Sequence, residues 1–351
     1  MKKQEILSYV GNMQQVASIQ PVSYTEGVAK GLGAYLIRNG DLSFTVMQDK
    51  CLDIAQLSYK GINMSFLSKP GLQHTGRIAS KSDRTTIMGG FLFTAGLENV
   101  GEPATLDKRN HPLHGEMRAI PAEHVSARAS WVDDEYLLAV SGEMRESELF
   151  GPNLLLRREI RTTFPGKSFT ITDEIENQAF HDEPFLLLYH INFGYPFLTE
   201  KCVILIPSEE VVPINDISGK HVDTWDRMEK PIPGKEEYVF RHTLAKRQDG
   251  TTIVGIYNTE LKIGVSIAYD PEILPHCMEW KTLGSGDYAL GLEPANVTVA
   301  GRQYHQDDKS LPMLRSFEKR IVELKITIVD GDEEFEHVKA LIADMKGSIS
   351  E

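Results

Sequence analysis

The carboxylate of Glu293 is the first candidate for chemistry in this sequence. It ends a short apolar run and is followed at once by Pro294, so the run cannot simply continue as a strand ladder. Alternation along an extended chain puts Gly291 and Glu293 on one face and Leu290 and Leu292 on the other. A glycine beside the acid predicts that another molecule can approach closely, and a carboxylate placed there suits a substrate-facing base.

A histidine and an asparagine form the second candidate. His190 and Asn192 follow three leucines and lie two residues apart, so they share one face of a predicted strand. A buried polar group without a partner costs about 1–3 kcal/mol, so both side chains need partners. The alternative to a functional site is a core histidine bonded to a backbone carbonyl, and the nearby Gly194 and Pro196 favour the functional interpretation.

The third group comprises His111, His114, Glu116 and Arg118. In a regular strand the last three would share one face and His111 would lie on the other. The two histidines therefore do not favour a metal site, because they diverge on a strand and an intervening proline opposes a helix. Gly115 predicts room for a ligand beside His114. The structural alternative is a turn in which Glu116 and Arg118 form a solvated pair.

The elements that must position these residues are predicted to be strands. Short alternating segments bounded by Gly, Pro, Asp and Asn recur along most of the chain, which is typical of an antiparallel sandwich or barrel. In residues 153–177 apolar and polar side chains alternate on both sides of a turn at Pro165, Gly166 and Lys167. This segment is predicted to be a β-hairpin.

A helix is predicted after the last strand. Residues 323–328 alternate as a strand, and an apolar set then recurs at three- and four-residue spacing behind acidic residues that favour a helix N terminus. We expect this C-terminal helix over residues 332–346. The apolar set comprises Phe335, Val338, Ile342 and Met345.

The chain is expected to form one β-rich domain over residues 1–351. No internal repeat, low-complexity block or linker-like change in composition divides it. Residues 1–20 would form an N-terminal arm, in which residues 5–16 could hold a short helix that Gly11 weakens.

The composition fits a globular protein with a small-molecule ligand. A chain of 351 residues that is 41% hydrophobic and 25% charged can bury a large core. The formal net charge of −13 argues against nucleic acid and anionic membranes as partners. We find neither a run of about 18 apolar residues nor the apolar core of a secretory signal, so the cytoplasm is the expected location. Cys51, Cys202 and Cys277 are widely spaced, which predicts reduced, buried thiols.

Six short segments together resemble the galactose mutarotase-like superfamily, and within it the uncharacterised group of aldose 1-epimerase-like proteins. Each segment alone is a weak signal, but they run in family order across residues 50–296, which makes the combination specific. They are residues 50–55 (Lys-Cys-Leu-Asp-Ile-Ala), 88–97 (Met-Gly-Gly-Phe-Leu-Phe-Thr-Ala-Gly-Leu), 112–115 (Pro-Leu-His-Gly), 172–177 (Thr-Asp-Glu-Ile-Glu-Asn), 189–196 (Tyr-His-Ile-Asn-Phe-Gly-Tyr-Pro) and 291–294 (Gly-Leu-Glu-Pro).

The resemblance implies an all-β fold, a β-supersandwich with a sugar cleft on one concave face. It also implies that His114, His190 and Glu293 meet in that cleft. An aldose 1-epimerase interconverts sugar anomers when one group removes the proton from the C1 hydroxyl and another protonates the ring oxygen, without cofactor or metal. We expect Glu293 to be the base and His190, as imidazolium, the acid, each favouring the charge of the other. His114 would hold the ring oxygen or an adjacent hydroxyl.

Further substrate contacts are expected from Arg118, Asn192, Arg84 and Trp280. Arg84 could be a sugar-binding arginine or part of a surface ion pair. Trp280 could stack on the apolar face of a sugar or lie in the core. The better-known mutarotases have a second glycine where this chain has Glu116, so the substrate stays open. The acidic composition gives no sign of a phosphosugar, which would need clustered Arg or Lys, and favours a neutral sugar or a sugar acid.

Two other functions are compatible with these residues. A carbohydrate-binding or regulatory protein would bind a sugar without turnover, but the joint presence of His114, His190 and Glu293 favours the enzyme. A metal-dependent sugar isomerase or lyase would use His111, His114, His190 or His276, and the lack of a His-x-His pair counts against it. An apolar edge strand or the terminal helix could form a homodimer interface.

Overall fold

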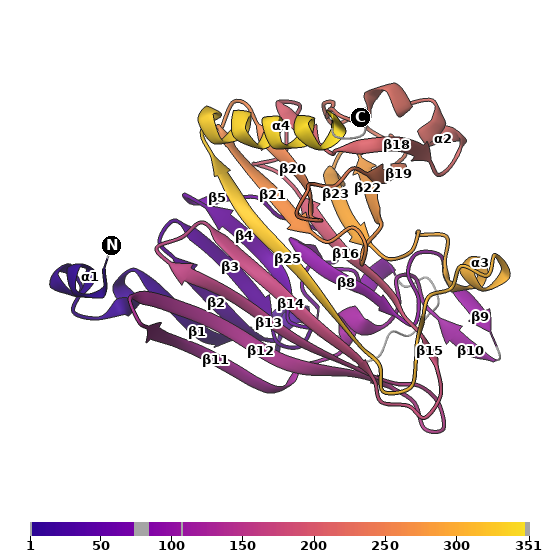
Figure 1. Cartoon of the computed structure of the whole chain (residues 1–351), viewed down its shortest axis with the longest axis horizontal. Coiled ribbons are helices and arrows are strands. Elements are labelled where there is room, and N and C mark those ends of the chain that lie inside the picture. The colour runs from indigo at the N-terminus through magenta and orange to yellow at the C-terminus, as the bar shows by residue number, and fades with distance from the viewer. Residues whose placement is uncertain (1, 74–83, 107, 348–351) are drawn as a thin grey trace.

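The structure is a computed structural model that describes residues 2–73, 84–106 and 108–347. In this part of the chain the strands form an eight-stranded, a six-stranded and a five-stranded sheet, with three two-stranded ribbons. Neighbouring strands within the three large sheets are antiparallel (Figure 1). The predicted all-β class is therefore confirmed.

The eight-stranded sheet contains the predicted hairpin. Leu154 pairs with Asn177 and Arg161 with Thr170, so the register follows the predicted turn. The predicted last strand is also present, as part of β25. In order across the sheet the strands are β11 (Glu123–Val132), β12 (Glu135–Ser147), β13 (Asn153–Phe164), β14 (Ser168–Asn177), β25 (Lys319–Asp330), β21 (Ile263–Tyr269), β20 (Thr252–Asn258) and β17 (Cys202–Leu205).

The six-stranded sheet carries most of the candidate site residues. Its strands in order are β18 (Ser208–Pro213), β19 (Tyr238–Leu244), β22 (His276–Thr282), β23 (Ala289–Ala295), β16 (Leu186–Phe193) and β8 (Leu92–Leu97). The five-stranded sheet runs β1 (Ala17–Ser23), β2 (Gly33–Asn39), β3 (Leu42–Met47), β4 (Asp53–Tyr59) and β5 (Ile62–Asn63). The ribbons pair β6 (Phe66–Leu67) with β7 (Gly89–Gly90), β9 (Ala104–Leu106) with β10 (Arg109–His111), and β15 (Glu183–Pro184) with β24 (Met313–Leu314).

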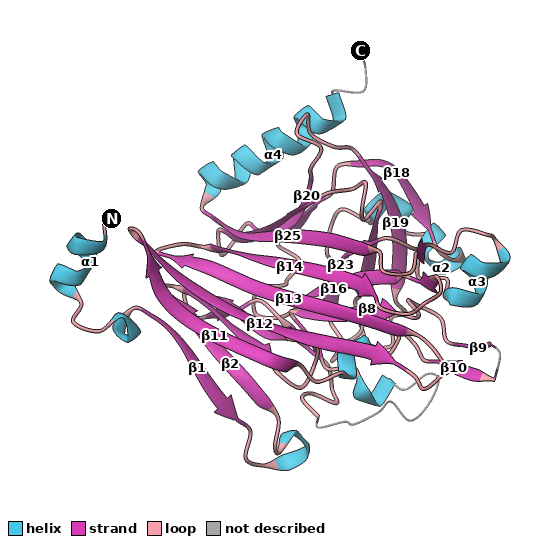
Figure 2. Ribbon diagram, turned by 60° about the horizontal axis from the view of Figure 1, so that its bottom comes forward, coloured by secondary structure: helices cyan, strands magenta, loops and turns pink. Residues whose placement is uncertain are grey.

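Helices lie outside the sheets. The predicted C-terminal helix is present as α4 (Asp332–Gly347), which lies across the end of the molecule that holds β20 (Figures 1 and 2). Its apolar face packs on Tyr257 and Val329. The other α-helices are short: α1 (Lys3–Tyr9), α2 (Asp216–Gly219) and α3 (Arg302–Asp307). Among the described residues, no helix has the length and apolar character needed to cross a membrane.

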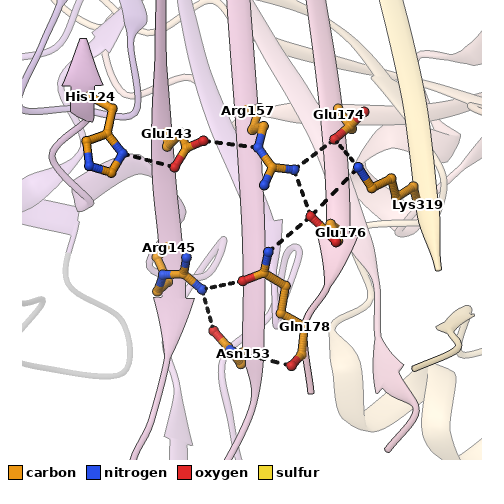
Figure 3. A network of polar contacts seen from close by, with 9 residues as sticks. All are labelled: His124, Glu143, Arg145, Asn153, Arg157, Glu174, Glu176, Gln178 and Lys319. Carbon is orange, nitrogen blue, oxygen red and sulfur yellow. Dashed lines mark hydrogen bonds and ion pairs between the residues drawn. The ribbon is translucent and has the colours of Figure 1, made fainter. Parts of the chain in front are cut away.

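One face of the eight-stranded sheet is polar. Arg157 on β13 forms ion pairs with Glu143 on β12 and with Glu174 and Glu176 on β14 (Figure 3). Lys319 on β25 extends this row to Glu174. The polar positions of the predicted hairpin thus form a charged outer face, while its apolar positions join a core shared with the other sheets.

A buried ionic cluster lies at the centre of this core. Arg158 follows Arg157 and therefore points inward, where it donates hydrogen bonds to Asp53 on β4 and to Asp173 on β14. Both ion pairs are fully buried. Tyr189 on β16 donates to Asp173, and Thr94 on β8 donates to Asp53. The cluster therefore connects all three large sheets directly beneath Phe93 and His190, the neighbours of Thr94 and Tyr189.

Candidate active site

Strand register brings the candidate residues of the six-stranded sheet onto one face. His190 on β16 pairs with Phe93 on β8, and Asn192 pairs with Gly291 on β23. Gly291 also pairs with Trp280 on β22. Directly paired residues of antiparallel strands point to the same side of a sheet, as do residues two apart on one strand. Glu293 is two residues from Gly291 and therefore shares this face.

A cleft of about 520 Å³ opens on this face. Six of the seven predicted site residues line it: Arg84, His114, His190, Asn192, Trp280 and Glu293. The sequence interpretation missed Phe93, Glu237 and Lys235, which also line the cleft. The signal for Phe93 was its place in the segment 88–97, whereas nothing in the pattern around Lys235 and Glu237 pointed to a site.

His190 and Glu293 form the floor of the cleft. Their fractional exposures are 7% and 2%, and Nε2 of His190 lies 3.0 Å from Oε1 of Glu293. The His190 ring stacks on Phe93, with ring centroids 4.3 Å apart and planes 24° apart. The rings of His114 and Trp280 each meet the imidazole in an edge-to-face arrangement, with centroids 5.5 Å away.

The contact between His190 and Glu293 is close but is not aligned as a hydrogen bond. Among the described residues, Oε1 of Glu293, Nδ1 of His190 and Oδ1 of Asn192 are buried without a hydrogen-bond partner. Buried polar atoms without partners are rare in folded proteins. Three such atoms belong to residues that line one cleft.

Burial disfavours the charged form of both members of this pair. It raises the pKa of Glu293 well above its ordinary value, and the nearby charge of Glu237 adds to this. Burial lowers the pKa of His190 to about 3, although the neighbouring Asn192 side chain opposes the shift. We expected each group to favour the charge of the other. The directions of the pKa shifts are opposite to this expectation. The free-energy cost of removing two charges from water outweighs the attraction that one poorly aligned contact between them supplies.

His114 comes to the cleft from a turn rather than a strand. It lies between β10 and the 3-10 turn η4 (Met117–Ala119) and has a positive φ of 59°. Its Nδ1 accepts a hydrogen bond from the backbone N–H of Gly101 at 3.3 Å, so the neutral ring carries its proton on Nε2. Burial, followed by the effect of His190, lowers the pKa of His114 well below its usual range. His114 is therefore a neutral hydrogen-bond donor.

The two glycines expected to leave room for a ligand have other roles. A Cβ atom on Gly115 would lie 2.3 Å from the carbonyl oxygen of Gly96 and 2.7 Å from that of Asn99. A Cβ atom on Gly291 would lie 2.4 Å from Oε1 of Glu293. Protein atoms therefore occupy the space beside each glycine. Gly115 is needed to place His114, and Gly291 is needed to place Glu293.

Arg118 does not line the cleft. Its buried guanidinium donates to the carbonyl oxygens of Leu113 and Gly115 and lies 3.4 Å from Oγ1 of Thr86. It braces the turn that carries His114, so it supports the site from behind instead of contacting a ligand. The guanidinium is buried, unlike a side chain of the solvated pair that we considered as the structural alternative.

His111 also lies behind the site. It is buried, and its Nδ1 is 2.5 Å from Oε2 of Glu98. Within the described ranges, no group of three or more His, Cys, Asp or Glu side chains is arranged to hold a metal ion. The four histidines of the metal-dependent alternative therefore do not converge, because only His114 and His190 reach the cleft.

Trp280 forms one wall of the cleft instead of packing in the core. Its Nε1 donates to Oε2 of Glu237 at 2.8 Å, and its ring meets that of Phe66 edge to face with centroids 6.3 Å apart. These contacts hold the indole beside His190. An aromatic face held in this way can cover the apolar face of a pyranose.

Comparison with known proteins identifies the fold. A candidate aldose 1-epimerase from Klebsiella pneumoniae has a similar structure, with a TM-score of 0.89 and 22% identity over 94% of this chain and 88% of that chain. A galactose mutarotase-like protein from Clostridium acetobutylicum has a TM-score of 0.60 and 14% identity, over 90% of this chain and 99% of its own. A galactose 1-epimerase from Lactobacillus acidophilus has a TM-score of 0.58 and 12% identity, over 90% and 100%.

These likenesses confirm the galactose mutarotase-like sandwich fold expected from the six sequence segments. No curated protein sequence matches the chain. A family model described as a domain of unknown function, DUF4432, matches residues 29–328. The chain therefore belongs to the DUF4432 family.

Proposed function

We propose that this protein is an aldose 1-epimerase that interconverts the α and β anomers of a sugar. The observation that carries the proposal is the contact between His190 and Glu293, which lie 3.0 Å apart on the floor of a cleft of about 520 Å³. Mutarotation requires one acid and one base within reach of two neighbouring oxygens, and an imidazole beside a carboxyl group supplies both.

The pair has the proton count that the reaction needs. Ring opening moves the proton of the C1 hydroxyl to a base, breaks the bond between C1 and the ring oxygen, and protonates that oxygen. Rotation of the C1 aldehyde and the reverse steps then give the other anomer. The Glu293–His190 pair has a charged form, carboxylate with imidazolium, and a neutral form, carboxyl with neutral imidazole. The two forms hold the same number of protons. Transfer of the Glu293 proton to His190, across the 3.0 Å contact, converts the neutral pair into the charged pair before opening. Glu293 as base and His190 as acid then return the pair to its neutral state during opening, and reclosure restores the charged state.

The remaining cleft residues position the sugar. Nε2–H of His114 would donate to the ring oxygen or to an adjacent hydroxyl, because Gly101 occupies its other nitrogen. Asn192 would bind a hydroxyl through Oδ1, which has no partner within the described residues. The indole of Trp280 would cover the apolar face of the ring.

The test is saturation-transfer proton NMR on a panel of aldoses, in which the rate of exchange between the α and β anomeric signals is measured. We expect the protein to accelerate exchange for at least one sugar, and Glu293→Gln and His190→Gln to abolish the acceleration while remaining folded. The exposed variants Glu123→Gln and His124→Gln are matched controls. Unchanged exchange in folded Glu293→Gln would refute the assignment. Sugar-induced stabilisation without accelerated exchange would instead indicate a binding protein.

A further inference from the structure

Exposed apolar side chains gather at one end of the eight-stranded sheet. Leu149 and Phe150 form the tip of the turn between β12 and β13, and Phe150 is 98% exposed. Phe180, in the loop after β14, is 89% exposed, and Phe317, just before β25, is 55% exposed. Because β13, β14 and β25 are neighbours, these loops leave the sheet side by side, at the end of β25 opposite α4 (Figure 1). We call these four residues the apolar tip.

Hydrogen bonds hold the loops of the apolar tip in place. The rings of Phe180 and Phe317 meet edge to face, with centroids 5.1 Å apart. The backbone N–H of Phe317 donates to the carbonyl oxygen of Asn177 at the end of β14. The turn between β12 and β13 is closed by the N–H of Gly151, which donates to the carbonyl oxygen of Glu148. A surface whose loops are already ordered loses little conformational entropy when it binds a partner.

Two of the phenylalanines have a backbone conformation that disfavours them. The angle φ is 61° at Phe150 and 59° at Phe317, in the left-handed region that glycine or asparagine adopts at lower cost. A bulky residue there destabilises the fold, and a ring exposed to water returns no hydrophobic stabilisation. The stability of a single chain therefore does not account for phenylalanine at these positions, whereas a binding surface would use both rings.

The apolar tip has the size and the rim of a protein interface. An aromatic side chain can bury about 150–250 Å², so the exposed fractions of the three phenylalanines leave roughly 360–600 Å² of aromatic surface in water. A standard interface buries about 800 Å² on each partner, with an apolar core and a polar rim. Exposed Arg315, Glu148 and Asp182 lie on the same three loops, one on each, and supply such a rim.

We propose that the apolar tip is a dimer interface, at which two copies of this chain meet about a two-fold axis. In such a contact the same patch serves both partners, so an apolar centre and a rim with both signs of charge make it self-complementary. The tip has both features. An anionic membrane suits it less, because the formal net charge of −13 repels the chain from such a surface. The interface lies neither on an edge strand nor on α4, the two homodimer surfaces considered from the sequence.

Sedimentation velocity over a range of protein concentrations tests this assignment. We expect wild type to form a dimer at micromolar concentration. Phe150→Ser and Phe180→Ser should each raise the dissociation constant of the dimer by about 30-fold or more, as the loss of an aromatic anchor does. Tyr9→Ser is the matched control, because Tyr9 is also an exposed aromatic residue but lies on α1, and this variant should dimerise like wild type. A wild type that is monomeric at every concentration, or phenylalanine variants with the wild-type dissociation constant, would overturn the proposal.

Spin labels locate the contact between the two copies. The native cysteines are buried, so a single introduced cysteine is labelled selectively. Glu148→Cys places the label beside the apolar tip, and Lys339→Cys places it on α4, which follows the opposite end of β25. In the proposed dimer the two labels at position 148 are closer together than the two at position 339. The reverse order in a dimer would place the contact elsewhere and refute the proposal. A monomeric wild type that co-sediments with neutral phosphatidylcholine vesicles would assign the tip to a membrane, which also refutes it.

Discussion

Gly291 and Glu293 are so close on one face of β23 that a Cβ atom on Gly291 would lie 2.4 Å from Oε1 of the glutamate. This added Cβ atom would also lie 3.3 Å from Cε1 of His190. The glycine therefore determines where the carboxyl group can rest, and the distance between Glu293 and His190 depends on it.

Replacing Gly291 with Ala should reduce activity far more than stability. The atom displaced is the end of a flexible side chain, so the fold can adjust, but the carboxyl group must leave its position beside His190. A misplacement of about 1 Å can lower a rate on the order of 100-fold. We expect a loss of that size in anomer exchange with little change in melting temperature. The control is Gly11→Ala, where a Cβ atom meets nothing within 4 Å. A fully active Gly291→Ala would contradict this role.

Replacing Gly115 with Ala should instead destabilise the protein. Gly115 has a φ of 70°, and its added Cβ would meet backbone carbonyl oxygens that cannot move independently. Gly61 has a φ of 79° with open space around it, so Gly61→Ala isolates the conformational penalty of about 1–2 kcal/mol. Chemical denaturation should show a larger loss for Gly115→Ala, by at least about 1 kcal/mol more. Equal losses would mean that the turn holding His114 can relax.

The neighbours Arg157 and Arg158 should respond differently to the same change. Arg158→Met leaves Asp53 and Asp173 buried without their cation, which typically costs about 3–5 kcal/mol. Arg157→Met removes ion pairs on the solvated face, each of which contributes at most about 1 kcal/mol. The free energy of unfolding from urea titration distinguishes them. Similar losses for the two variants would show that the inner cluster contributes no more than the outer one.

The rate of anomer exchange should be insensitive to pH around neutrality. The pair is active while it holds one exchangeable proton, that is, between the pKa of His190 and that of Glu293. Burial lowers the first to about 3 and raises the second well above its ordinary value, so the active range is wide. Unshifted groups would confine activity to roughly pH 4.3–6.5, with a loss above it. We expect catalysed exchange, corrected for the spontaneous rate, to remain undiminished as the pH rises through about 6.5, the ordinary histidine pKa. A decline with its midpoint near the ordinary histidine pKa would contradict the burial effect.

The strands and their two-faced character could be predicted because they follow local patterns. Alternation in residues 153–177 predicted the hairpin of β13 and β14, and three- and four-residue spacing predicted α4. The same alternation placed His190 with Asn192, and Gly291 with Glu293, on common faces. The six family segments predicted the sandwich that joins these elements.

The cleft itself required tertiary structure. Local pattern assigned Gly115 and Gly291 to ligand space, but Gly115 adjoins the backbone of Gly96 and Asn99, and Gly291 adjoins the side chains of Glu293 and His190. Arg118 stood among the site residues in sequence and lies behind them in space, since His114 is on a turn and not on a regular strand.

The sequence by itself determined which residues could do chemistry and which of them share a strand face, because side-chain direction along a strand depends only on the local backbone. The tertiary structure decided which strands are neighbours, how Trp280 meets Glu237, and that burial disfavours the charged forms of His190 and Glu293. Those properties depend on pairing between distant segments and on the exclusion of water, and neither is a property of a residue and its neighbours in sequence.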